Sequence, residues 1–311
     1  MARLACRCAG ALLSLLLSAT LVHAGLLVVA PHPDDDLLMA AGVIFQAVQA
    51  GEPVTVVYLT NGDNNRETSY GLARQAEAVE GQRLLGLQED HLIFLGYPDG
   101  YLHPILNDYI HPGETVITTF NRSMTYGRRG LGRRDYHSYR FGGPANYNRS
   151  HLVADLGDII AMLRPGHIYV TSEFDTHPDH AATYWLTRLA LQAVHADRPE
   201  YAPMVHKTIV HWAYQTWRHP MDATSLFPEI PGLDRTGLVW NHRECLEVPL
   251  PMQSTDLTIN PKYQAIAAHA SQGGVKGYLK HYVHRDEFFW AESIVGGHPY
   301  PAPAASLQCG P

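Results

Sequence analysis

Four side chains that can bind a metal ion or carry a proton lie within five positions near the start of the chain: His32, Asp34, Asp35 and Asp36. They follow the apolar run 26–30 and Pro31, which ends that run. A short unbroken apolar run is typical of a strand buried on both faces of a parallel sheet. One aspartate could cap the helix that follows, but a cap does not explain three carboxylates beside an imidazole. The stretch therefore predicts a metal or catalytic site.

A second group of chemically active side chains lies in His177-Pro178-Asp179-His180. Its two histidines are three residues apart at the start of an apolar helical pattern, so both rings can face one point. The two groups together could supply three ligands to one divalent ion. A catalytic zinc ion takes three nitrogen or oxygen ligands and leaves the fourth position to water, whose pKa it lowers. A lone histidine is more often a hydrogen-bonding core residue, but two matching groups favour a metal site.

These groups need a scaffold that brings the ends of strands together. The predicted strands are 26–30, 54–59, 91–95, 168–171 and 208–213, with an edge strand at 288–291, and the predicted helices are 37–50, 72–85, 151–163, 181–194 and 261–271. Strands and helices alternate, which predicts an α/β, Rossmann-like fold with a mostly parallel sheet flanked by helices. Ligands of such sheets bind at the carboxyl ends of the strands, where both groups lie.

Residues 101–150 interrupt this alternation and are predicted to form a substrate loop. They contain eight aromatic residues, and seven arginines against three acidic residues, while the rest of the chain is acidic. Long loops in compact domains are often lids or binding loops. The composition suggests a surface for a sugar ring with anionic groups nearby, and the alternative is a solvated loop fixed by salt bridges. Asn121 and Asn148 lie in glycosylation sequons, which have meaning only in a eukaryotic source.

The N-terminal segment has the pattern of an export signal. Arg3 and Arg7 precede the apolar run 11–21, and Val22-His23-Ala24 forms a small-residue cleavage site. Residues 1–24 are therefore predicted to be a cleaved signal peptide of a secreted or periplasmic protein, and the alternative is a retained anchor. Residues 25–311 show no internal repeat and no linker, which predicts a single domain.

Composition narrows the class of protein further. The chain has 311 residues, of which 46% are hydrophobic, enough for a large core. A net charge of −7 argues against a nucleic-acid partner, and no stretch after the signal is long enough to be a transmembrane helix. Cys6 and Cys8 would leave with the signal, whereas Cys245 and Cys309 would remain and could form one disulfide, a pairing that the sequence leaves open.

Pro31-His32-Pro33-Asp34-Asp35 together with His177-Pro178-Asp179-His180 resembles the paired motifs of the PIG-L (LmbE-like) family of zinc-dependent N-acetylglucosaminyl deacetylases. The resemblance covers most of the mature chain in order. It also includes shorter segments, each of them weak alone: 60–63, 74–77, 96–100 and 262–272. The chain departs from the family in having Asp36 where Glu is usual, and in a loop longer than that of small intracellular members.

The resemblance implies a role for the residues of both motifs. His32, Asp35 and His180 match the family's metal positions and would hold one zinc ion per chain. Asp34 would be the general base that takes a proton from the zinc-bound water. His177 would polarise the amide oxygen and stabilise the oxyanion.

Three further residues match positions around that centre. Asp179 would orient a catalytic imidazole. Arg74 and Asp99 match substrate-binding positions, with Asp99 accepting hydrogen bonds from sugar hydroxyls. For Arg74 the alternative is a surface salt bridge with Glu77, one helical turn away.

The resulting prediction is a zinc-dependent hydrolase that removes the N-acetyl group from an N-acetylglucosamine-containing glycan or glycoconjugate. Amide hydrolysis needs an activated water, an electrophile for the carbonyl oxygen and a proton for the leaving amine, which zinc, Asp34 and His177 would provide. The alternatives are an exported zinc amidase or esterase acting on another conjugate, and a non-catalytic carbohydrate-binding protein with a structural metal. A structural site would need a fourth protein ligand and would not need Asp34.

Overall fold

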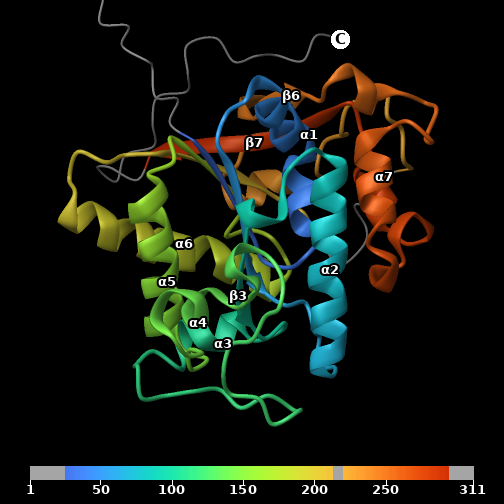
Figure 1. The fold of residues 1–311 in the computed structure, drawn as a ribbon. Coiled ribbons are helices and arrows are strands. Elements are labelled where there is room, and N and C mark those ends of the chain that lie inside the picture. Colours follow the sequence, from blue (N-terminus) through green and yellow to red (C-terminus); the bar gives the residue numbers. More distant parts are fainter. Residues whose placement is uncertain (1–24, 213–219, 294–311) are drawn as a thin grey trace, which may run out of the picture.

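The computed structural model describes residues 25–212 and 220–293. Its centre is one seven-stranded sheet in the order β3-β2-β1-β4-β5-β7-β6 (Figure 1). The parallel strands are β1 (Leu26–Ala30), β2 (Val54–Thr60), β3 (Leu92–Tyr97), β4 (His167–Thr171) and β5 (Met204–Thr208). β7 (Asp286–Ser293) pairs antiparallel with β5 and with β6 (Glu244–Glu247). The predicted α/β fold with a mostly parallel sheet is confirmed.

Helices cover both faces of the sheet. One face carries α1 (Asp35–Ala50), α2 (Thr68–Leu84) and α7 (Pro261–Ala267), and the other carries α3 (Leu102–Asn107), α4 (Tyr136–Phe141), α5 (Arg149–Leu163) and α6 (Pro178–Asp197). Side chains alternate between the faces, as the period of a strand requires. In β1, Val28 and Ala30 join the core under α1, whereas Leu27 and Val29 join the core under α5 and α6. This burial on both faces explains the unbroken apolar run.

The chain order of the strands reverses beside β1. From β1 the chain moves outward through β2 to β3 and then returns to place β4 on the other side of β1. A reversal of this kind leaves a crevice at the carboxyl ends of the two central strands. The two predicted groups follow β1 and β4, so the topology brings them to one place.

Two strand predictions were wrong in position. The fifth strand is β5, which ends at Thr208, where we expected it to begin. The strand was not recognised because it contains polar residues. Lys207 can be buried there because its ammonium group lies 2.6 Å from Glu173 and 3.0 Å from Glu292. The predicted edge strand lies inside the sheet, between β5 and β6. β6 was not predicted, because its sequence Glu-Cys-Leu-Glu is too short and polar for an apolar pattern.

The helix after β4 begins earlier than predicted, and α7 ends earlier. α6 starts at Pro178 and not at residue 181, so Asp179 and His180 lie in its first turn. α7 ends at Ala267, and a separate turn covers Ala270–Gln272. The first difference matters for the site, because the helix start fixes where His180 points.

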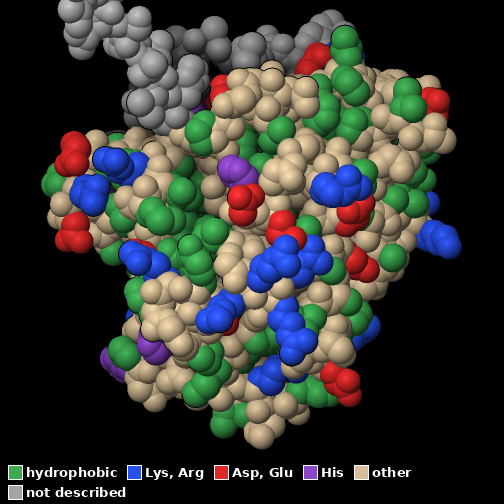
Figure 2. Space-filling model, viewed as in Figure 1, with side chains coloured by type: hydrophobic (Ala, Val, Ile, Leu, Met, Phe, Trp, Pro, Cys, Tyr) green, Lys and Arg blue, Asp and Glu red, His purple; other side chains and the backbone are tan. Residues whose placement is uncertain are grey.

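Residues 101–150 contain α3, α4 and irregular segments. Three of the seven arginines pair with carboxylates: Arg122 with Asp63, Arg129 with Glu89 at 2.7 Å, and Arg140 with Asp158 at 2.8 Å. For these three, the salt-bridge alternative is confirmed. Arg128, Arg133 and Arg134 are exposed and have no ion pair within the described residues. Lys and Arg side chains gather on the face drawn in Figure 2, in the area where Figure 1 shows the loop.

Some predictions concern segments outside the described residues. These are the signal peptide at 1–24 and Cys309, whose pairing with Cys245 the sequence left open. Among the helices of residues 25–212 and 220–293, none is long and apolar enough to cross a membrane.

Candidate metal centre and active site

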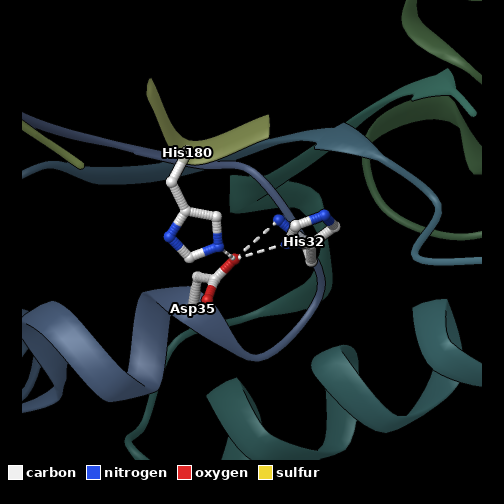
Figure 3. Close-up of side chains that lie close together, drawn as sticks. All are labelled: His32, Asp35 and His180. Carbon is white, nitrogen blue, oxygen red and sulfur yellow. Dashed lines mark hydrogen bonds and ion pairs between the residues drawn. The ribbon is translucent and has the colours of Figure 1, made fainter. Parts of the chain in front are cut away.

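The turns after β1 and β4 bring three predicted metal ligands together (Figure 3). His32 Nδ1 lies 2.9 Å from Asp35 Oδ2, and His180 Nε2 lies 3.2 Å from the same oxygen. The backbone N–H of His32 also donates to Asp35 Oδ2 at 3.0 Å. All three residues are buried, and their potential ligand atoms lie within 4.8 Å of one another. The structure therefore brings His180 to two residues that lie 145 and 148 positions earlier in the sequence.

The surroundings of His180 show whether His32, Asp35 and His180 suit a zinc ion. Its Nε2 is buried and makes no hydrogen bond of acceptable geometry within the described residues. Such an atom is costly unless something else satisfies it. Oxygen and nitrogen ligands about 2.0–2.2 Å from a tetrahedral zinc lie roughly 3.3–3.6 Å apart. The separations of 2.9 and 3.2 Å around Asp35 Oδ2 are close to that spacing, so the residues present fit the metal.

The outward nitrogen of His32 faces two further carboxylates. His32 Nε2 lies 3.1 Å from Asp99 Oδ1 and 3.3 Å from Asp179 Oδ2. Asp179 is itself fixed, because the backbone N–H groups of Gly100 and Leu102 donate to it at 2.6 and 3.0 Å. A carboxylate on the outer nitrogen of a histidine orients the ring toward a metal. The Asp179 carboxylate thus contacts the imidazole of His32, whereas the imidazole of His177 accepts the backbone N–H of Asp179.

His180 has the same arrangement with a residue that the sequence analysis missed. Its Nδ1 lies 3.2 Å from Asp175 Oδ2, and Asp175 is buried. The signal was present in the sequence, since Asp175 precedes His177 by two residues in the loop after a predicted strand. It was missed because that position matched none of the motif residues.

Asp34, the predicted general base, contacts a buried guanidinium. Arg74 Nη2 lies 3.0 Å from Asp34 Oδ1, and both side chains are buried. Burial raises the pKa of Asp34 to about 7, although the charge of Arg74 opposes that rise. By contrast, the pKa of Asp35 is held well below its usual range, because His180 and His32 outweigh the effect of burial. Neighbouring carboxylates thus differ in basicity, as expected of a base beside a metal ligand.

His177 lies beside the three ligands as the N-cap residue of α6. Its ring centroid is 5.0 Å from that of His32 and 4.8 Å from that of His180. Its Nδ1 accepts the backbone N–H of Asp179 at 3.2 Å, so the neutral ring carries its proton on Nε2. Burial and the neighbouring His180 lower its pKa to about 4. His211, which the sequence analysis also missed, lies 4.8 Å from His180 and 5.5 Å from His177 between ring centroids.

Arg74 and Asp99, the predicted substrate-binding residues, lie at the edge of the same site. Arg74 Nη1 donates to Gly62 O at 2.8 Å and lies 3.8 Å from Asp99 Oδ2. The alternative for Arg74, a surface salt bridge with Glu77, is wrong, because Arg74 is buried and faces Asp34 and Asp99. Glu77 instead accepts hydrogen bonds from the backbone N–H and the hydroxyl of Ser271 at 2.8 and 2.6 Å.

Asp36 faces away from the ligand residues and contacts Tyr58 and Gln82. Its Oδ2 accepts a hydrogen bond from the Tyr58 hydroxyl at 2.8 Å and another from Gln82. In the described part of the chain two sets of residues could hold a metal, His32 with Asp35 and His180, and His32 with His177 and Asp179, and Asp36 belongs to neither. Asp36 therefore links α1 to β2 and α2 and stands outside both ligand sets.

A buried histidine and carboxylate set of this kind, at the switch point of an α/β sheet, defines a candidate metal-dependent enzyme. Residues 27–191 match the family model PIG-L, described as GlcNAc-PI de-N-acetylase. The match covers more than half of the chain, and the protein belongs to the PIG-L family.

A curated relative is similar to part of the chain. It is the 1D-myo-inositol 2-acetamido-2-deoxy-alpha-D-glucopyranoside deacetylase of Tsukamurella paurometabola, 30% identical over 177 residues, which are 55% of this chain and 56% of that protein. The chain thus matches about half the length of this relative.

Solved structures of similar proteins include two deacetylases. The N,N'-diacetylchitobiose deacetylase of Pyrococcus horikoshii is 17% identical, with a TM-score of 0.49 over 91% of this chain and 88% of that one. A deacetylase of the A40926 pseudoaglycone is 18% identical, with a TM-score of 0.48 over 86% of this chain and 96% of that one.

Proposed function

We propose that this protein is a zinc-dependent deacetylase that removes the N-acetyl group from an N-acetylglucosamine-containing glycan or glycoconjugate. The observation that carries the proposal is the convergence of His32, Asp35 and His180 on one point, with Asp34 beside them and outside the ligand set. Three ligands leave a coordination position open, which a catalytic site needs and a structural site does not. Membership of the PIG-L family supports the choice of reaction.

The chain's own residues supply the proton transfers. A zinc ion bound here would polarise the amide carbonyl and make a bound water more acidic. Asp34 is the base that takes the proton of the attacking water, since its pKa of about 7 lets it accept and return a proton near neutral pH. Arg74 holds Asp34 Oδ1, which leaves Oδ2 to bind the proton. The same carboxyl can then protonate the leaving amine.

His177 stabilises the charge that develops on the amide oxygen. Its Nδ1 is used by the backbone N–H of Asp179, so Nε2–H is the donor that faces outward from the cap. A pKa lowered to about 4 keeps the ring neutral near pH 7, and the Nε2–H of the neutral imidazole can donate a hydrogen bond to the oxyanion. Asp99, held by His32 and close to Arg74, accepts hydrogen bonds from sugar hydroxyls at the rim.

Acetate release tests the proposal directly. Purified protein is stripped of metal, reloaded with zinc, and assayed on chito-oligosaccharides and on N-acetylglucosaminyl glycolipids. We expect about one zinc per chain and acetate release from at least one substrate, lost on stripping and restored by zinc. Binding of the sugars without acetate release, in protein that contains zinc, would contradict the proposal and favour a carbohydrate-binding protein. Release from other amides or esters only would favour an amidase or esterase.

We also propose that the protein is exported through residues 1–24, with cleavage after Ala24. Expression of the full chain in a secreting host, followed by mass measurement of the external protein, tests this. A mass that includes residues 1–24 would contradict it.

A further inference from the structure

Asp175 joins three segments of the chain at the site. It follows β4 and precedes α6, and it is buried. Its Oδ1 accepts the backbone N–H of His177 at 2.9 Å. Its Oδ2 accepts the backbone N–H groups of Val210 and His211 at 2.8 and 2.9 Å, directly after β5. One carboxylate therefore fixes the turn before the helix to the exit of the neighbouring strand.

The same carboxylate determines which nitrogen of His180 faces the metal position. His180 Nδ1 lies 3.2 Å from Asp175 Oδ2, so Nδ1 carries the hydrogen of that bond. In the neutral ring Nε2 then carries the lone pair, and Asp35 Oδ2 lies 3.2 Å from it on the side where the metal would be held. A metal ligand needs that lone pair, and the partner on the other ring nitrogen sets it.

His32, the other predicted ligand histidine, is held in the same way as His180. His32 has Asp35 on one ring nitrogen and Asp179 on the other, as His180 has Asp35 and Asp175. Asp179 and Asp175 are both anchored by backbone N–H groups, which hold each carboxylate in place. The two aspartates, four positions apart, thus each hold one of the two ligand histidines.

We propose that Asp175 is a positioning residue that sets the tautomer and orientation of His180 for metal binding. This proposal rests on the proposed function, in which His180 is a zinc ligand. The proposal predicts that replacing Asp175 weakens metal binding more than it destabilises the fold. Asp175 touches neither the substrate nor the attacking water in this account.

Zinc affinity of the full chain, measured by competition with a chromophoric chelator, tests the proposal. Asp175→Asn removes the charge and places an amide where His180 Nδ1–H needs an acceptor. We expect a loss of about 10–100-fold in zinc affinity, a changed visible spectrum of the cobalt-substituted protein, and partial recovery of kcat at high zinc. The matched control is Asp155→Asn, because Asp155 is also buried and lies 2.8 Å from His137, a histidine outside both candidate ligand sets. The control should keep wild-type zinc affinity.

Three results separate this proposal from its premise. Zinc affinity and cobalt spectrum unchanged in Asp175→Asn would overturn the proposal and leave the proposed function standing. Wild-type protein that binds no zinc would overturn both. If Asp175→Asn does not fold, nitrogen NMR of histidine in the zinc-loaded wild type decides: we expect His180 bound through Nε2 with its hydrogen on Nδ1, and binding through Nδ1 would overturn the proposal.

Discussion

Charged side chains are arranged differently in the site at the strand ends and in the loop at 101–150. In the site, Asp34, Asp35, Asp99 and Asp179 crowd around one arginine and two histidines, and all are buried. In the loop, Arg122, Arg129 and Arg140 each have one carboxylate. Paired charges hold a loop in place with little net energy. Carboxylates in excess at a buried point are costly unless a cation joins them.

The difference shows how to tell a ligand site from a structural charge cluster. Each ion pair of the loop links one cation to one anion. In the site, Asp35 Oδ2 is shared by two histidines, and a buried histidine nitrogen has no hydrogen bond within the described residues. Several side chains that converge on one buried point favour a metal site, whereas one-to-one ion pairs do not.

Removal of a ligand should have the largest effect. His32→Ala, Asp35→Ala and His180→Ala should each lose most of the zinc, because two remaining ligands hold the metal poorly. Zinc is measured by mass spectrometry of the purified proteins. Arg129→Ser, which breaks a loop ion pair, serves as the control and should keep its zinc. Full zinc content in all three ligand variants would contradict the assignment.

Removal of Arg74 should shift the pH profile. The charge of Arg74 lowers the pKa of Asp34, so in Arg74→Met that pKa should rise above its value in the wild type. The base must be unprotonated, so the acidic limb of kcat/KM against pH should move to higher pH. A neighbouring opposite charge shifts a carboxyl pKa by about one unit or more, which predicts roughly tenfold lower activity on that limb. An unmoved limb would show that another group is the base.

The exposed arginines of the loop should matter only for extended, anionic substrates. Arg128, Arg133 and Arg134 are exposed without an ion pair in the described part of the chain, and Arg side chains favour phosphate and carboxylate groups. Replacing all three by Ser should lower kcat/KM several-fold on such a substrate, and less at high salt. Activity on a single N-acetylglucosamine unit should change little. Arg129→Ser, whose partner is Glu89, should instead cost stability of about 1 kcal/mol or less.

The smallest effect concerns stability and not activity. Burial raises the pKa of Asp155 to about 6, above the value of about 3.9 for an exposed aspartate. The folded state then holds this proton more tightly than the unfolded state, so stability falls as pH rises from about 4 to 6. Asp155→Asn should flatten that slope, as measured by urea unfolding at several pH values. A slope unchanged from the wild type would show that other groups dominate.

The sequence predicted the parts of the molecule that depend on local pattern. β1 lies where its apolar run predicted it, and His32, Asp35 and His180 meet because parallel strands place their carboxyl ends together. β5 and β6 escaped prediction because their polar residues are satisfied by partners far apart in sequence. His206, for example, has a ring nitrogen 2.6 Å from Glu244.

Asp175 and His211 escaped for a related reason. The bonds that anchor Asp175 to the backbone of Val210 and His211 depend on β5 lying next to β4, which no local spacing reveals. The prediction for residues 101–150 was partly wrong because it considered the charge of the loop only as a net charge. The structure shows which arginines are already paired, and composition cannot.

The most direct test of the account measures zinc content and acetate release in one preparation of Asp34→Asn. The substitution keeps the size of the side chain and can still accept from Arg74, but it cannot take a proton. We predict about one zinc per chain, as in the wild type, and a loss of kcat of about 10²–10⁴-fold. Near wild-type turnover with zinc bound would contradict the account, because the base would have to lie elsewhere.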